Sequence, residues 1–162
     1  MIRVSTPSWS TRSLKPTSTT VKTGTSLGYG RKRDRLEDKV RTLEHADGIT
    51  FKGFLEAYDD VLAQMQTAEI FASPSTREGF GITYAEAMAA NCTVIGADHP
   101  ESPASEVIGN AGFVVESITD ALRQTHEGDT PTDDPVKHAR QHDWDTITDQ
   151  AATYQWASEH HW

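Results

Sequence analysis

Residues 73–90 read SPSTREGFGITYAEAMAA, and this stretch decides the fold that we expect. The apolar run at residues 70–72 leads into it as a short buried strand would, and its alanine-rich end is typical of a helix. The order strand, loop, helix predicts one corner of an open α/β sheet. Ligands bind at such corners because the carboxyl end of a strand meets free N–H groups and the positive dipole end of a helix.

On either side of this corner, short apolar runs alternate with amphipathic segments. The pattern predicts strands at residues 49–52, 68–72, 93–97 and 113–115, and helices at residues 33–44, 58–67, 104–108 and 118–124. Because strands and helices alternate, we expect an α/β fold with a Rossmann-like, mainly parallel sheet and helices on both faces. Two further helices should follow, one ending near residue 142 and one over residues 144–158, and should pack back on the domain.

The N-terminal residues differ from the rest in composition. Residues 1–27 hold six serines, seven threonines and two prolines without a sustained period, so we predict a poorly ordered segment in which only residues 19–27 could form an edge strand. The expected organisation is this segment, a ligand-binding domain at residues 28–126, and a linker with C-terminal helices at residues 127–162.

Length and charge exclude several classes of protein. A chain of 162 residues with a net charge of −9 suits one acidic domain, and no segment approaches the roughly 18 to 20 apolar residues of a membrane span. Residues 1–20 also lack the apolar core of a signal peptide, so a cytoplasmic location is expected, with association at a membrane surface left open. Residues 1–33 carry seven basic and no acidic residues, but serine, threonine and proline dilute them, so we expect no nucleic-acid partner.

Few residues suggest a metal or a reactive thiol. The single cysteine, Cys92, comes just before an apolar run and is expected to be buried. His138 and His142 have a spacing that can bind zinc on a helix, but no third ligand is evident, so we expect no metal and no cofactor.

Two carboxylates flank the glycines of the central stretch. Glu78 directly precedes Gly79-Phe80-Gly81, and Glu86 lies about one turn into the predicted helix, so both can face one cavity. A carboxylate can accept hydrogen bonds from two vicinal hydroxyls, and each charge-assisted bond contributes about 1.5–3 kcal/mol. The pattern therefore suits the sugar and the ribose of a sugar nucleotide, with the helix dipole near the diphosphate.

At these residues a family resemblance becomes plain. The run EGFGITYAEAMAANCTVIGAD resembles the donor-site signature of retaining glycosyltransferases of family 4, within the glycosyl transferases group 1. The segments GYG, GITFKGFL and SEVIGNAGFVVE are similar to further family motifs in the right order, and the resemblance covers about residues 28–124. It implies the C-terminal, donor-binding half of a GT-B fold.

The resemblance also implies roles for single residues. Glu78 would hold the donor sugar as the catalytic-site carboxylate, and Glu86 would hold the ribose. The remaining donor-binding positions are the backbone near the sugar and phosphate and the segment beside the base: Gly79, Phe80, Gly81 and Ile82, then Gly53, Phe54 and Leu55. The implied reaction is transfer of a hexose from a UDP-, GDP- or ADP-sugar with retention of configuration, without a bound metal.

The chain departs from the family pattern before residue 28. The family's first strand and helix, with the basic element that neutralises the diphosphate, are not evident there, and neither is an acceptor-binding domain. The resemblance therefore implies a fragment whose first 27 residues are not native to the fold and which transfers little alone. Two alternatives stay open: a non-catalytic module that binds a nucleotide sugar and pairs with a chain supplying the acceptor half, and a GT-B type sugar-nucleotide epimerase.

Overall fold

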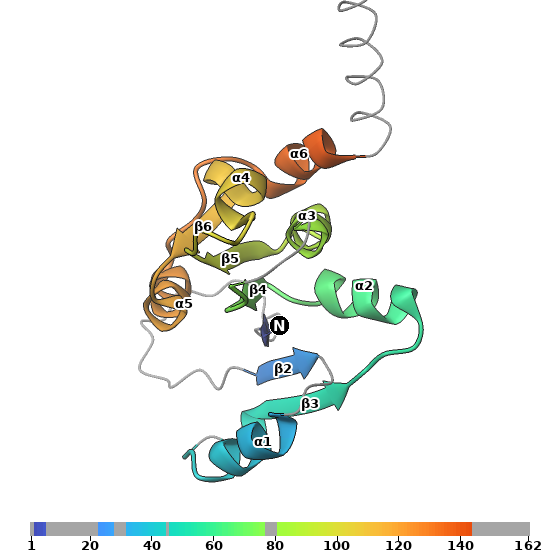
Figure 1. The fold of residues 1–162 in the computed structure, drawn as a ribbon, viewed down its shortest axis with the longest axis vertical. Coiled ribbons are helices and arrows are strands. Elements are labelled where there is room, and N and C mark those ends of the chain that lie inside the picture. Colours follow the sequence, from blue (N-terminus) through green and yellow to red (C-terminus); the bar gives the residue numbers. More distant parts are fainter. Residues whose placement is uncertain (1, 6–22, 28–31, 45, 77–80, 144–162) are drawn as a thin grey trace, which may run out of the picture.

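The computed structural model describes residues 2–5, 23–27, 32–44, 46–76 and 81–143, which contain a six-stranded sheet with helices (Figure 1). The strands are β1 (Ile2–Ser5), β2 (Thr23–Leu27), β3 (Ile49–Gly53), β4 (Ile70–Ser73), β5 (Thr93–Ala97) and β6 (Gly112–Val115). The α-helices are α1 (Arg33–Arg41), α2 (Tyr58–Gln66), α3 (Ile82–Ala89), α4 (Ala104–Ile108), α5 (Ile118–Glu127) and α6 (Pro135–Ala139). Short 3-10 turns are η1 (Ala46–Gly48), η2 (Gly109–Ala111) and η3 (Arg140–His142).

The sheet has the strand order β3-β2-β1-β4-β5-β6. β2 pairs with β3 in parallel, and so do β4 with β5 and β5 with β6, whereas β1 is antiparallel to both of its neighbours, β2 and β4. Two reversals restore the direction, so every strand except β1 runs the same way. The predicted Rossmann-like, mainly parallel sheet is confirmed, and the carboxyl ends of its five parallel strands lie at one edge.

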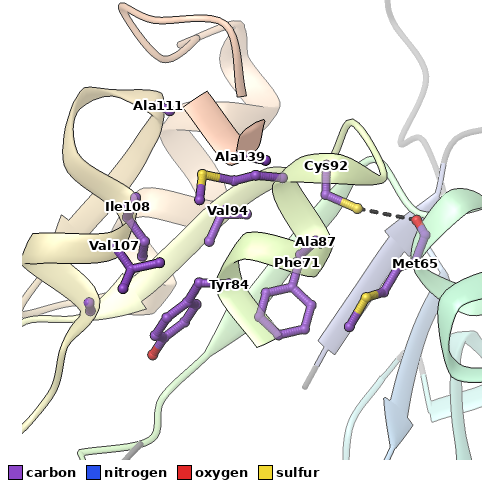
Figure 2. Close-up of a cluster of buried hydrophobic side chains, with 12 residues drawn as sticks. Met65, Phe71, Tyr84, Ala87, Cys92, Val94, Val107, Ile108, Ala111 and Ala139 are labelled. Carbon is purple, nitrogen blue, oxygen red and sulfur yellow. Dashed lines mark hydrogen bonds between the residues drawn. The ribbon is translucent and has the colours of Figure 1, made fainter. Parts of the chain in front are cut away.

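Alternate residues of the parallel strands face two different cores. Phe71 and Val94 pack with α3 and α4, and Figure 2 shows these side chains beside Tyr84 and Ile108. The neighbouring residues Ile70, Ala72 and Ile95 pack with α5 on the other face. Helices therefore cover both faces of the sheet, because a strand buried on both sides needs an apolar partner for each face.

The single cysteine lies in the first of these cores. Cys92 is fully buried, and its thiol donates to the backbone oxygen of Met65 at 3.2 Å, as the dashed line in Figure 2 marks. Burial raises the pKa of this thiol to about 11. The prediction of a buried thiol is confirmed, and the group is held in its neutral form near pH 7.

The N-terminal segment corrects one prediction. Within residues 1–27, which we expected to be poorly ordered, the structure places β1 and β2 in the sheet. β2 was expected at most at the edge, but it lies between β3 and β1, and β1 lies between β2 and β4. Pairing with distant strands satisfies the backbone groups of these short segments, and a local pattern does not reveal such partners.

The amphipathic face predicted for residues 33–44 is only partly covered. α1 lies beside β3 (Figure 1), and Arg33 donates to the backbone oxygen of Phe51 at 3.3 Å. Leu36 and Leu43 nevertheless remain 49% and 48% exposed, and α1 contains no buried residue. Within the described residues, α1 is therefore held more by its polar contacts than by a core.

The C-terminal part is described as far as Asp143. α6 and η3 follow the polar linker, and Ala139 of α6 packs into the core shared with α3. The predicted helix at residues 144–158 lies outside the described residues. In the part of the chain that the structure describes, no helix has the length and apolar character needed to cross a membrane.

Candidate functional site

α3 begins at Ile82, and a glycine shapes its first turn. Gly81 is the N-cap residue with φ 68° and ψ 16°, a left-handed backbone conformation that residues with a β-carbon rarely adopt. Its backbone oxygen accepts from the N–H of Tyr84 at 2.9 Å, which starts the helical hydrogen bonding. A β-carbon at Gly81 would lie 2.8 Å from Cγ2 of Val107. The glycine therefore lets the start of α3 approach α4 closely.

The two sides of α3 have different surroundings. Tyr84, Ala87 and Met88 are fully buried in the core. Residues on the opposite side line an open groove of about 760 Å³, together with residues of α2, α4, α6 and η3 and the residue that follows η3. The lining consists of Tyr58, Gly81, Ile82, Ala85, Glu86, Ala89, Val107, Val136, Ala139, Arg140, His142 and Asp143. Most of this lining is apolar, so the few polar groups stand out as candidate ligand contacts.

Glu86 is one of two acidic residues among the described residues of this lining, the other being Asp143. Glu86 lies in the second turn of α3 and is partly exposed. The hydroxyl of Tyr58, the first residue of α2, donates a hydrogen bond to Oε1 of Glu86. Among the described residues, Glu86 forms no ion pair. An ionised carboxylate with acceptor capacity left in a groove can receive hydroxyl donors from a ligand.

The contact also affects the tyrosine. The hydrogen bond to Glu86 is the largest cause that raises the pKa of Tyr58 to about 12, with burial and the negative charge of Glu86 acting in the same direction. The phenol therefore stays protonated over the whole physiological range, and it acts as the donor in this pair.

The segment predicted to flank a base lies shortly before α2. Gly53 ends β3 with φ 75° and is buried, Leu55 is half-buried, and Phe54 is 73% exposed. A β-carbon at Gly53 would lie 2.6 Å from Nη1 of Arg33. Because α2 starts at Tyr58, this segment leads directly to the helix whose first residue contacts Glu86.

Several predicted site residues cannot be compared with the structure. Glu78, Gly79 and Phe80 lie outside the described residues, so their roles stay predictions. Ile82 is the first residue of α3, is 49% exposed and lines the groove with Gly81 and Glu86. The structure thus brings together three of the predicted residues.

The described residues contain no group of three or more metal-ligand side chains. The rings of His138 and His142 lie 5.5 Å apart between centroids, and Nε2 of His138 is 3.0 Å from the backbone oxygen of Val107. The contact between His138 and Val107 joins α6 to α4, and we assign it a structural role.

Some residues of the groove were not predicted from the sequence. Tyr58 was expected only as the start of a helix, and Arg140 was not singled out. Arg140 and His142 both belong to the lining, and Nε2 of His142 is buried without a hydrogen-bond partner among the described residues. The only sequence signal for Tyr58 was a large polar aromatic residue at a helix start close to the predicted base-binding segment.

Comparison with known proteins gives the family. The family model described as glycosyl transferases group 1 matches residues 25–126. No curated protein matches the chain. The fold is similar to the crystal structure of TarM, with a TM-score of 0.61 and 19% identity over 83% of this chain and 28% of that chain.

A second solved structure is the pneumococcal O-GlcNAc transferase GtfA in complex with UDP and GlcNAc, matched with a TM-score of 0.47 and 23% identity over 83% of this chain and 26% of that chain. The chain thus spans little more than a quarter of the length of these two proteins. Since the family model matches more than half of its residues, the chain belongs to the glycosyl transferases group 1 family.

Proposed function

We propose that the chain is the donor-binding part of a hexosyltransferase and binds a UDP-, GDP- or ADP-sugar in the groove along α3. The observation that carries the proposal is the Glu86 carboxylate, which lines the groove without an ion-pair partner among the described residues. Its free acceptor capacity suits the vicinal hydroxyls of a ribose. Family membership supports glycosyl transfer as the reaction.

The position of the groove supports a ligand with a diphosphate. α3 starts at the carboxyl edge of the parallel strands, where its first N–H groups and positive dipole end favour an anion. The same lining contains the basic residue Arg140, together with the acidic residues Glu86 and Asp143. In this proposal the diphosphate lies near Gly81 and Ile82, the ribose near Glu86, and the base towards Gly53, Phe54 and Leu55.

The proposal includes a retaining mechanism in which Glu78 holds the donor sugar. It follows the family resemblance of the segment EGFGITYAEAMA. We expect the 162-residue chain to bind a nucleotide sugar weakly and to transfer little, because acceptor binding is assigned to another half of the fold or to a partner chain. Measurable hexose transfer by the chain alone would contradict this last point.

Calorimetric titration with UDP-, GDP- and ADP-glucose tests donor binding. Glu86→Gln keeps the size of the side chain but removes its charge, so affinity should fall by between about tenfold and a hundredfold, as expected for lost hydrogen bonds to a charged group. Glu106→Gln is a matched control, since Glu106 is an exposed residue of α4 outside the groove lining. Equal affinity of the two variants would show that Glu86 does not contact the ligand.

A further inference from the structure

Tyr58 and Glu86 come from different helices and meet at the groove. The two residues are 28 positions apart, and the hydroxyl at the start of α2 reaches the carboxylate in the second turn of α3. Tyr58 is 57% exposed, so its ring does not belong to a hydrophobic core. Both residues line the groove. The contact therefore lies on the surface that a ligand would touch.

The hydrogen bond from Tyr58 engages one of the two carboxylate oxygens of Glu86 and leaves the other free of bonds to the described residues. Oε1 of Glu86 accepts from Tyr58, and no other described residue bonds to this carboxylate. Oε2 and one lone pair of Oε1 remain as acceptors. A carboxylate held by one fixed donor presents its free lone pairs in one orientation, whereas an unsupported glutamate side chain loses rotamer freedom when it binds.

We propose that Tyr58 is a positioning residue for recognition of a vicinal diol: it fixes the Glu86 carboxylate so that the free acceptor oxygens meet the ribose hydroxyls of the nucleotide. The inference rests on the proposed function, since it assigns a ribose to Glu86. The raised pKa of Tyr58 is consistent with it, because the phenol remains a donor at every pH at which the protein would act.

The test uses the full chain and three variants, Tyr58→Phe, Glu86→Gln and Tyr84→Phe. Each is titrated with UDP, GDP and ADP and with the 2′-deoxy form of each nucleotide. Tyr58→Phe removes only the hydroxyl, and we expect a loss of about tenfold in affinity for the preferred ribonucleotide and little change for its deoxy form. The ratio of the two affinities should therefore approach one.

Tyr84→Phe is the matched control, because it removes a hydroxyl that is buried outside the groove lining. It should keep the ribonucleotide preference of the unchanged protein. A general loss of structure in Tyr58→Phe would weaken both forms of the nucleotide equally, so the affinity ratio separates positioning from a merely structural role.

The outcomes distinguish the two proposals. If Glu86→Gln removes the ribonucleotide preference while Tyr58→Phe retains it, the role of Tyr58 is overturned and the ribose assignment stands. If the unchanged protein binds nucleotides without preferring the ribose form, the ribose assignment is wrong and the role of Tyr58 is overturned with it. Absence of binding to all three nucleotides would overturn the proposed function itself.

Discussion

Replacing Gly81 with alanine should destabilise the protein through the contact between α3 and α4. Two features act against the added methyl group. The backbone at Gly81 has φ 68°, and the new β-carbon would lie 2.8 Å from Cγ2 of Val107 and 3.2 Å from Cγ of Pro103. Pro103 is the N-cap residue of α4, and Val107 lies within this helix. The methyl group would therefore press α4 away from the start of α3.

The expected magnitude has two parts. A left-handed backbone costs a residue with a β-carbon about 1–2 kcal/mol. Overpacking of a buried contact adds about 1–3 kcal/mol. The free energy of unfolding should therefore fall by about 2–5 kcal/mol, which is a large share of the roughly 5–15 kcal/mol that stabilises a typical domain.

Gly128→Ala is the control that separates the two parts. Gly128 also has a positive φ, 117°, but a β-carbon there would meet no atom within 4 Å. Gly128→Ala should therefore lower the free energy of unfolding by the backbone cost alone. Urea unfolding followed by far-ultraviolet circular dichroism measures both variants.

A double variant tests the contact itself. Val107→Ala removes the Cγ2 atom that the new methyl group would meet. The double variant Gly81→Ala/Val107→Ala should therefore be more stable than the sum of the two single changes predicts, by about 0.5–3 kcal/mol. Additive effects, or a Gly81→Ala cost no greater than that of Gly128→Ala, would refute the reasoning.

Three further predictions concern two buried groups, the thiol of Cys92 and the hydroxyl of Tyr84. With its thiol pKa raised from 9.0 to about 11, Cys92 should react with Ellman's reagent at pH 8 about 100-fold more slowly in the folded protein than in urea, and equal rates would contradict its burial. Because this pKa is raised on folding, the stability linked to it is fully present below pH 9 and is lost as the pH rises through about 11. The hydroxyl of Tyr84 is buried without a hydrogen-bond partner among the described residues, so Tyr84→Phe should leave the thermal midpoint unchanged or raise it, and a fall of several degrees would indicate a partner outside them.

The sequence predicted best the elements whose signals are local. Residues 93–97 and 104–108 form β5 and α4 with the expected bounds. For β5, a short apolar run between turn residues leaves few alternatives. The parallel sheet followed from the alternation of such segments. Gly81 was named as backbone near the sugar and phosphate, whereas its left-handed conformation was not predicted.

The sequence predicted poorly what depends on distant partners. β1 is four residues long and lies among serines and threonines, and its place follows only from pairing with β2 and β4. The contact between Tyr58 and Glu86 likewise depends on how α2 and α3 pack, which no local pattern encodes. The half-exposed Leu36 and Leu43 show the reverse case: an amphipathic pattern is present, but its apolar partner is not among the described residues.

The reversed strand β1 has a consequence for how the protein can lose structure. β2 and β3 form one parallel ladder, β4, β5 and β6 form another, and four residues of β1 supply the strand pairing that joins them. The two ladders are thus joined at the centre of the sheet by a strand of only four residues near the N-terminus. Fraying of β1 would uncouple the two ladders, so amide hydrogen exchange in β2 and β3 should be able to proceed without opening β5. A fusion placed ahead of Ile2 would act directly on this joining strand.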